Sequence, residues 1–210
     1  MVKIIDSHDH KVVAEAFSLI EGMINCIGKK DEQRKQNPFC QSLIDNGIVD
    51  KLIQHIDSRR GNYNIQIAHL FAYLFKAAPL PSQIRKQVID QLFEREDFDK
   101  LLLLAECREN QDDIIANDLG SQFNKDLGYF STIDIIHLIN KILELGSNSN
   151  KAKIALATNK KLYILTNDEE EKIRKKSIKT MKIIVDIFEQ VEEEGQFEDI
   201  DAISIHSKQK

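Results

Sequence analysis

The chain has 210 residues, of which 42% are hydrophobic, and this is enough apolar content for one domain with a substantial core. Only 8 glycines and 3 prolines are present, which argues against a β-sandwich or an α/β barrel, since both folds need many turns. The net charge of −5 gives no general case for binding to nucleic acid or to an acidic membrane. No apolar run approaches the roughly 18 residues of a membrane span, and the first residues lack the apolar core of a secretory signal.

The first periodic segment predicts a capping helix over residues 9–28. Apolar residues recur at helical spacing from His10 to Ile27, and Ser7 or Asp9 stands where a helix cap is needed. A polar linker from Gly28 to Gln36 follows.

The clearest helical unit covers residues 37–78. Its pattern predicts a short helix from Pro38 to Asp45, a break at Gly47, and helices from Ile48 to Asp57 and from Asn62 to Ala77. We expect Asn37 to cap the first of these helices, with Pro38 in the first helical position.

The sequence over residues 79–146 predicts a repeat region that is less regular than the unit at 37–78. We expect helices over 82–93 and 97–107, and a helix through 114–123 that Gly120 and Gly128 shorten or interrupt.

A strong helix closes this region. Ser131 or Thr132 is expected to cap it, and Gly146 to end it. A loop from Ser147 to Asn150 should then lead into the next unit.

A degraded second copy of the clear unit covers residues 149–190, 113 positions further along the chain. The apolar pairs that relate the two copies are Leu43 and Leu156, Val49 and Leu162, Leu52 and Leu165, Phe71 and Ile184, Leu74 and Ile187, and Phe75 and Phe188. Helical repeats of about 40 residues are typical of a solenoid. After the second copy the sequence turns acidic and loses periodicity, so residues 195–210 are expected to form an appendage or a disordered tail.

The clear unit resembles an armadillo repeat, and the related HEAT repeat is the alternative. The stretch from Asn37 to Val49 is similar to the first helix and the glycine turn of that family, and residues 50–56 are similar to its second helix. Residues 66–75 are similar to its third helix, which lines a concave groove in the family.

The resemblance implies an all-α, right-handed solenoid of about three to four units over residues 1–194. It also implies a non-catalytic scaffold or adaptor that binds protein partners without a cofactor, as an extended segment or another subunit. Family roles extend to cytoskeletal or ciliary assembly, complex scaffolding and transport. The chain has no tryptophan, which argues against a nuclear-import receptor.

Four segments align as third helices and predict a stacked core. Their apolar columns are Leu19, Leu70, Leu138 and Ile183; Ile20, Phe71, Ile139 and Ile184; Met23, Leu74, Ile142 and Ile187; and Ile24, Phe75, Leu143 and Phe188.

Polar residues beside these columns predict a partner-binding groove, composed of His69, Tyr73, His137, Lys141, Lys182 and Asp186. The alternative is that they are solvated residues on an exposed face. Tyr73 is the strongest anchor candidate, because aromatic residues concentrate binding energy.

A basic stretch of the last long helix allows two interpretations. It consists of Lys172, Arg174, Lys175, Lys176 and Lys179. One interpretation is a solvated face paired with its own acids, and the other is a face that docks on nucleic acid or an acidic filament. Against nucleic acid as the main partner, the whole chain is acidic and no aromatic residues interleave with the basic ones.

The N-terminal sequence from Asp6 to His10 resembles the start of a metal-dependent hydrolase barrel. On a strand, His8 and His10 would point to one side and could hold a divalent metal. Such a barrel needs roughly 250 residues and eight strands, and no strand alternation follows. We therefore expect an N-terminal cap and no metal site.

Other signs of catalysis are missing from the sequence, which has no phosphate loop, nucleophile elbow or paired Cys-x-x-Cys. We predict that the protein is not an enzyme. Cys26, Cys40 and Cys107 are widely spaced in apolar helical patterns, so buried reduced thiols and a cytoplasmic location are expected.

Overall fold

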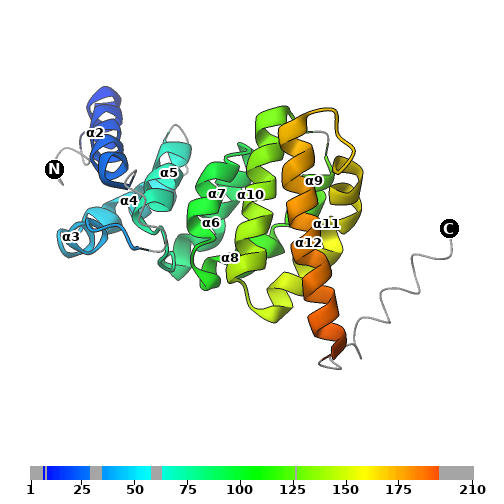
Figure 1. The fold of residues 1–210 in the computed structure, drawn as a ribbon. Helices are drawn as coiled ribbons and strands as arrows, with labels where there is room; N and C mark the ends of the chain where they lie inside the picture. Colours follow the sequence, from blue (N-terminus) through cyan, green and yellow to red (C-terminus); the bar gives the residue numbers. More distant parts are fainter. Residues whose placement is uncertain (1–6, 8, 29–34, 58–62, 126, 194–210) are drawn as a thin grey trace.

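The computed structural model describes residues 7, 9–28, 35–57, 63–125 and 127–193, and it shows helices stacked side by side in an elongated array (Figure 1). Helices account for well over half of these residues, and the described part of the chain contains no strand. The prediction of an all-α solenoid is therefore confirmed. The predicted tail over 195–210 lies outside the described residues.

The helices of the array follow one another with short connections. They are α2 (His10–Gly28), α3 (Cys40–Asp45), α4 (Ile48–Asp57), α5 (Asn64–Leu74), α6 (Ser82–Glu94), α7 (Phe98–Leu104), α8 (Arg108–Ala116), α9 (Leu119–Asn124), α10 (Tyr129–Leu145), α11 (Asn148–Leu165) and α12 (Glu171–Glu193).

Five helices form one row through the array, in which α2 packs on α5, α5 on α7, α7 on α10 and α10 on α12. The remaining helices flank this row, with α6 packed on α8, and α8 and α9 packed on α11. The sequence alignment placed α5 and α10 next to each other, but α7 lies between them (Figure 1). The shortness of α7, with 7 residues, explains why it was not aligned as a third helix.

The predicted start of α2 is confirmed. The Lys11 amide donates to Oδ1 of Asp9 at 2.9 Å, which satisfies one of the free N–H groups of the first turn. At the next unit, Oδ1 of Asn37 accepts from the Phe39 amide at 3.0 Å. That contact closes a turn, and the helix begins at Cys40 instead of Pro38.

Gly47 separates α3 from α4 because its φ of 66° lies in the left-handed region, which residues with a side chain rarely adopt. The second copy has Lys160 at the matching position, and α11 accordingly runs unbroken through 18 residues. The predicted loop from Ser147 to Asn150 is wrong, since Ser147 caps α11 by accepting from the Asn150 amide at 3.2 Å.

The break before α9 lies at Asp118 and not at Gly120. Asp118 has a φ of 58°, and its Oδ1 accepts from the Ser121 amide at 3.2 Å. Gly120 lies inside α9, where an added Cβ would come within 2.7 Å of Cβ of Ala157. This glycine therefore permits the close approach of α9 to α11.

The prediction that Ser131 or Thr132 caps α10 is also wrong, because the helix begins at Tyr129 with Gly128 as its cap residue. Thr132 instead donates its hydroxyl to the carbonyl of Leu127 at 3.3 Å. At the other end, Gly146 ends the helix as predicted.

Most residues of the predicted apolar columns form part of the core. Ile20, Phe71, Ile139 and Ile184 are all buried. Leu19 and Met23 differ from their columns, with 66% and 50% of their surface exposed. They lie on α2, the first described helix of the row, whose outer side is not covered by another described helix.

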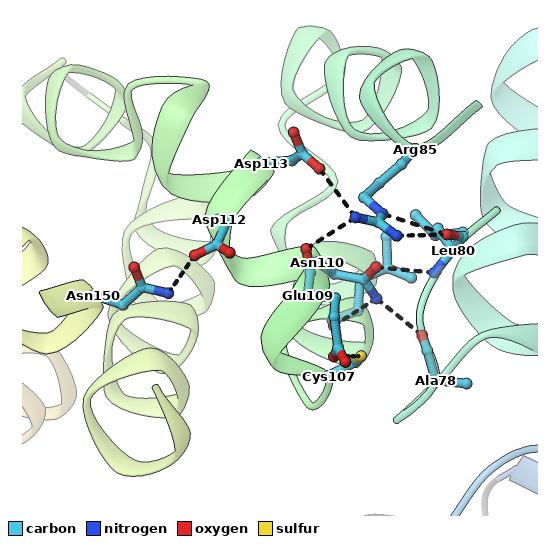
Figure 2. A network of polar contacts seen from close by, with 10 residues as sticks. Ala78, Leu80, Arg85, Cys107, Glu109, Asn110, Asp112, Asp113 and Asn150 are labelled. Atoms are coloured by element: carbon cyan, nitrogen blue, oxygen red, sulfur yellow. Dashed lines mark hydrogen bonds and ion pairs between the residues drawn. The ribbon is translucent and has the colours of Figure 1, made fainter. Parts of the chain in front are cut away.

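A buried carboxamide joins the middle repeats (Figure 2). Asn110 on α8 is fully buried, and its Nδ2 donates to the carbonyls of Ala78 at 3.0 Å and Leu104 at 3.1 Å. Its Oδ1 accepts from the Leu80 amide at 3.0 Å. One side chain thus satisfies three backbone groups, from the connection between α5 and α6 and from the end of α7.

Further polar contacts tie α8 to the helices around it (Figure 2). Nη2 of Arg85 donates to the carbonyl of Leu80 at 3.0 Å, and Nη1 of the same arginine lies 3.7 Å from Oδ2 of Asp113. On the other side, Nδ2 of Asn150 donates to Oδ1 of Asp112 at 2.8 Å. These contacts connect α6, α8 and α11.

Replacing Phe71 with alanine should lower the free energy of unfolding by roughly 3–5 kcal/mol, because the ring is fully buried between stacked helices. Chemical denaturation measures the change. The matched control is Leu19→Ala, which should change it by roughly 0.5 kcal/mol or less because Leu19 is largely exposed. Equal losses in the two variants would contradict the packing described for α2 and α5.

Replacing Asn110 with alanine should cost roughly 2–4 kcal/mol, since three buried backbone groups would lose their partner. The same denaturation measurement tests this, with Asn148→Ala at an exposed helix position as the control. A near-neutral Asn110→Ala would show that the connection between α5 and α6 does not depend on the carboxamide.

Candidate functional site

Charged and aromatic side chains form a polar strip along the row of helices described above, from α5 through α7 and α10 to α12. The strip consists of His69 and Tyr73 on α5, Asp97, Asp99 and Lys100 at α7, Asp134, His137 and Lys141 on α10, and Lys176 on α12. Neighbouring members contact or influence one another across the helix boundaries, as the following contacts show.

At the boundary between α5 and α7, Nε2 of His69 lies 2.9 Å from Oδ2 of Asp97. One turn further, Nζ of Lys100 lies 5.1 Å from the centre of the Tyr73 ring, within the range of a cation–π contact. Burial disfavours the Lys100 charge, but hydrogen bonds with Asp99 and Tyr73 outweigh it and raise the pKa of Lys100. The ammonium group is therefore held over the ring in its charged form.

At the boundary between α10 and α12, the ammonium group of Lys176 contacts Nε2 of His137. Burial and the nearby Lys176 charge lower the pKa of His137. The imidazole is therefore neutral at pH 7, which leaves Nε2 free to accept a hydrogen bond from the ammonium group.

Asp134 connects the two boundaries electrostatically. Burial and the negative charge of Asp99 raise the pKa of Asp134, while His137, Lys172 and Lys100 act in the opposite direction. The acid on α10 is thus under the influence of charged groups on both α7 and α12.

Four of the six predicted groove residues lie in this strip: His69, Tyr73, His137 and Lys141. Each has a partner on a neighbouring element, as Lys141 does in Glu106, whose Oε1 lies 3.9 Å from Nζ of the lysine. Sequence reasoning missed the partners at residues 97–106, because α7 was not aligned with the long helices. Asp134 could have been found, since it lies one turn before His137 on the same helix face.

The other two predicted groove residues, Lys182 and Asp186, lie in a different place. They line an open hollow of about 580 Å³ between α11 and α12, together with Tyr163, Thr166, Ile178, Met181 and Val185. The structure thus divides the predicted set between the polar strip and this hollow.

The basic stretch of α12 is partly paired within the chain. Nζ of Lys175 lies 2.5 Å from Oε1 of Glu171, and Nη1 of Arg174 donates to the carbonyl of Asp168 at 2.6 Å. Lys176 contacts His137, whereas Lys172 and Lys179 are exposed to solvent.

The N-terminal histidine motif lies mostly outside the residues that the structure describes. His8 is not described, and of His10 only the backbone is, as the first residue of α2. Within the described ranges, no group of three or more His, Cys, Asp or Glu residues is arranged to hold a metal ion.

The described cysteines are Cys40 and Cys107, and both are free and buried. Burial raises the pKa of each thiol, which keeps it protonated. The side chain of Cys26 lies outside the described residues. No helix in the described part of the chain is both long and apolar enough to cross a membrane.

The pKa of His137 gives a pH-dependent prediction. Because its folded pKa is lowered, the unfolded chain binds the proton more readily, so the contribution of His137 to stability is present above pH about 6.5 and is lost on acidification below it. A titration followed by NMR should place the His137 pKa below about 6.5, and Lys176→Met should raise it. A normal value that does not respond to Lys176→Met would contradict the contact between α10 and α12.

Comparison with known proteins identifies the type of fold. No protein-family model matches the sequence, and no curated protein matches it either. Among solved structures, the chain is similar to a designed armadillo repeat protein, with 16% sequence identity and a TM-score of 0.61. The match covers 87% of this chain and 80% of the designed protein. The chain therefore has an armadillo-like repeat fold.

Proposed function

We propose that this protein is a non-catalytic scaffold or adaptor that binds a protein partner along the polar strip. The observation that carries the proposal is the position of the strip. Charged and aromatic side chains from α5, α7, α10 and α12 gather along a row of helices whose buried positions are mostly apolar. Solenoids recognise partners through extended surfaces of this kind.

The chemistry of the strip suits an extended polar segment of a partner protein. Acids and bases both occur along it, so a segment that carries charges of both signs would find complementary groups. Tyr73 supplies an aromatic anchor near one end, and its ring is already held by Lys100. Such internal contacts fix the side chains before the partner binds, which lowers the entropic cost of association.

The biological setting extends the proposal. Free buried thiols suit a reducing compartment, and we place the protein in the cytoplasm on that basis. A subunit of a large assembly, cytoskeletal or ciliary among them, is the role that a non-catalytic repeat scaffold would fill.

The test removes the anchor and one charge of the strip together. Affinity capture with the wild-type chain supplies the partner, and calorimetry measures its affinity. Tyr73→Ala combined with Lys141→Met should weaken binding at least tenfold, which corresponds to about 1.4 kcal/mol or more. Methionine is chosen at position 141 because it keeps the apolar stem of the half-buried lysine while it removes the charge.

The matched comparison reverses three charges on the exposed face of α12, with Lys172, Lys175 and Lys179 each replaced by glutamate. Lys176 is spared because it contacts His137. Thermal unfolding of both variants separates lost binding from lost stability. If the reversal abolishes binding and the double variant of the strip has no effect, the basic face of α12 binds the partner and the proposal is wrong.

A further inference from the structure

Both ends of the helix row expose apolar side chains. On α2, Val12, Leu19 and Met23 lie on one face and are 39%, 66% and 50% exposed. At the other end, Tyr163 and Ile164 on α11 and Ile178 and Val185 on α12 are also exposed. Repeat proteins normally close their ends with polar caps, so these two faces require an explanation.

The exposed face of α2 is the one that points toward a preceding repeat. The alignment of the long helices places Val12 at the same position as Tyr63 next to α5 and Lys176 on α12. Both of these residues reach the helix before their own: the Tyr63 ring lies 5.6 Å from the Phe17 ring on α2, and Lys176 contacts His137 on α10. Val12, Leu19 and Met23 therefore point to where a preceding helix would pack.

The exposed face of α12 is the one that points toward a following repeat. In the same alignment, Met181 on α12 matches Phe17 on α2, whose ring meets His55 of α4 edge-on with the centres 5.9 Å apart. Met181 is partly buried and lines the open hollow together with Ile178 and Val185. The two ends thus carry the two halves of a repeat-to-repeat interface.

We propose that the occupant of the hollow between α11 and α12 is α2 of a second copy of this chain, so that copies stack head to tail. A single chain carries both halves of the interface, and each half uses positions that are buried between repeats inside the array, such as Leu70 and Leu74 on α5. Charge is compatible with the pairing, since the hollow is lined by Lys182 and Asp186 while α2 exposes Glu15, beside Val12 and Leu19, and Lys11 one turn earlier. Because this contact joins two different surfaces, each pair of copies still has a free α2 face at one end and a free hollow at the other. Further copies can therefore add, and rings or filaments form.

The experiment blocks each end separately in the full chain. Leu19→Glu with Met23→Glu disables the α2 end, and Ile178→Glu with Val185→Glu disables the α12 end. Sedimentation velocity should show that the average mass of the wild type rises with concentration, whereas each variant alone remains a monomer. An equimolar mixture of the two variants should form a dimer and nothing larger, because one intact α2 end meets one intact hollow.

The matched control is Tyr129→Glu, which replaces an exposed aromatic residue at the start of α10, between α7 and α12 in the row, and should associate like the wild type. The double variant of the polar strip should also associate normally, so the two proposals can fail independently. A wild type that stays monomeric, or an end variant that still associates with itself, would overturn head-to-tail stacking. Association that begins only when residues 195–210 are deleted would assign the hollow to that segment and would also overturn it.

Discussion

The carboxamide of Asn110 is the contact on which the stacking of the middle repeats depends. Between two helical units the chain must turn, and the turn leaves backbone groups without helical partners in a place that water does not reach. Asn110 donates to two such carbonyls and accepts from one such amide. Neither aspartate nor leucine could do both, because the former cannot donate when ionised and the latter has no polar group. The apolar columns can align across α7 only while this connection holds its shape.

Local periodicity was enough to predict most helices, because their amphipathic pattern is set by residues close together in the chain. The bounds of α4 and the stop at Gly146 were predicted correctly. The break at Asp118 was not predicted, since a left-handed aspartate leaves no periodic signal. Gly120 was misread as a breaker for a tertiary reason, namely the close approach of Ala157. Such contacts between distant segments are not encoded in local spacing.

The candidate site was predicted in part for the same reason. His69, Tyr73, His137 and Lys141 were found because they share a register with buried columns on long helices. The partners of His69 and Tyr73 lie at α7, whose 7 residues are too few to show the register of a third helix. The alignment consequently treated α5 and α10 as neighbours and missed the charges that separate them. A short helix in a repeat array is where sequence reasoning is weakest, although it supplies half of the polar contacts of the strip.

The stacking sides of the long helices and the polar strip between these helices have a combined consequence for binding. One side points to the preceding helix and one to the following helix, and the polar strip runs along the boundaries between helices. Stacking of copies would continue the row of helices and would place the strip of one copy next to that of another. A partner with several recognition segments could then engage adjacent strips, and its second segment would bind at the effective concentration set by the linker. Individually weak contacts along the strip would suffice for firm attachment, which is how a small scaffold without a deep pocket can hold a large partner.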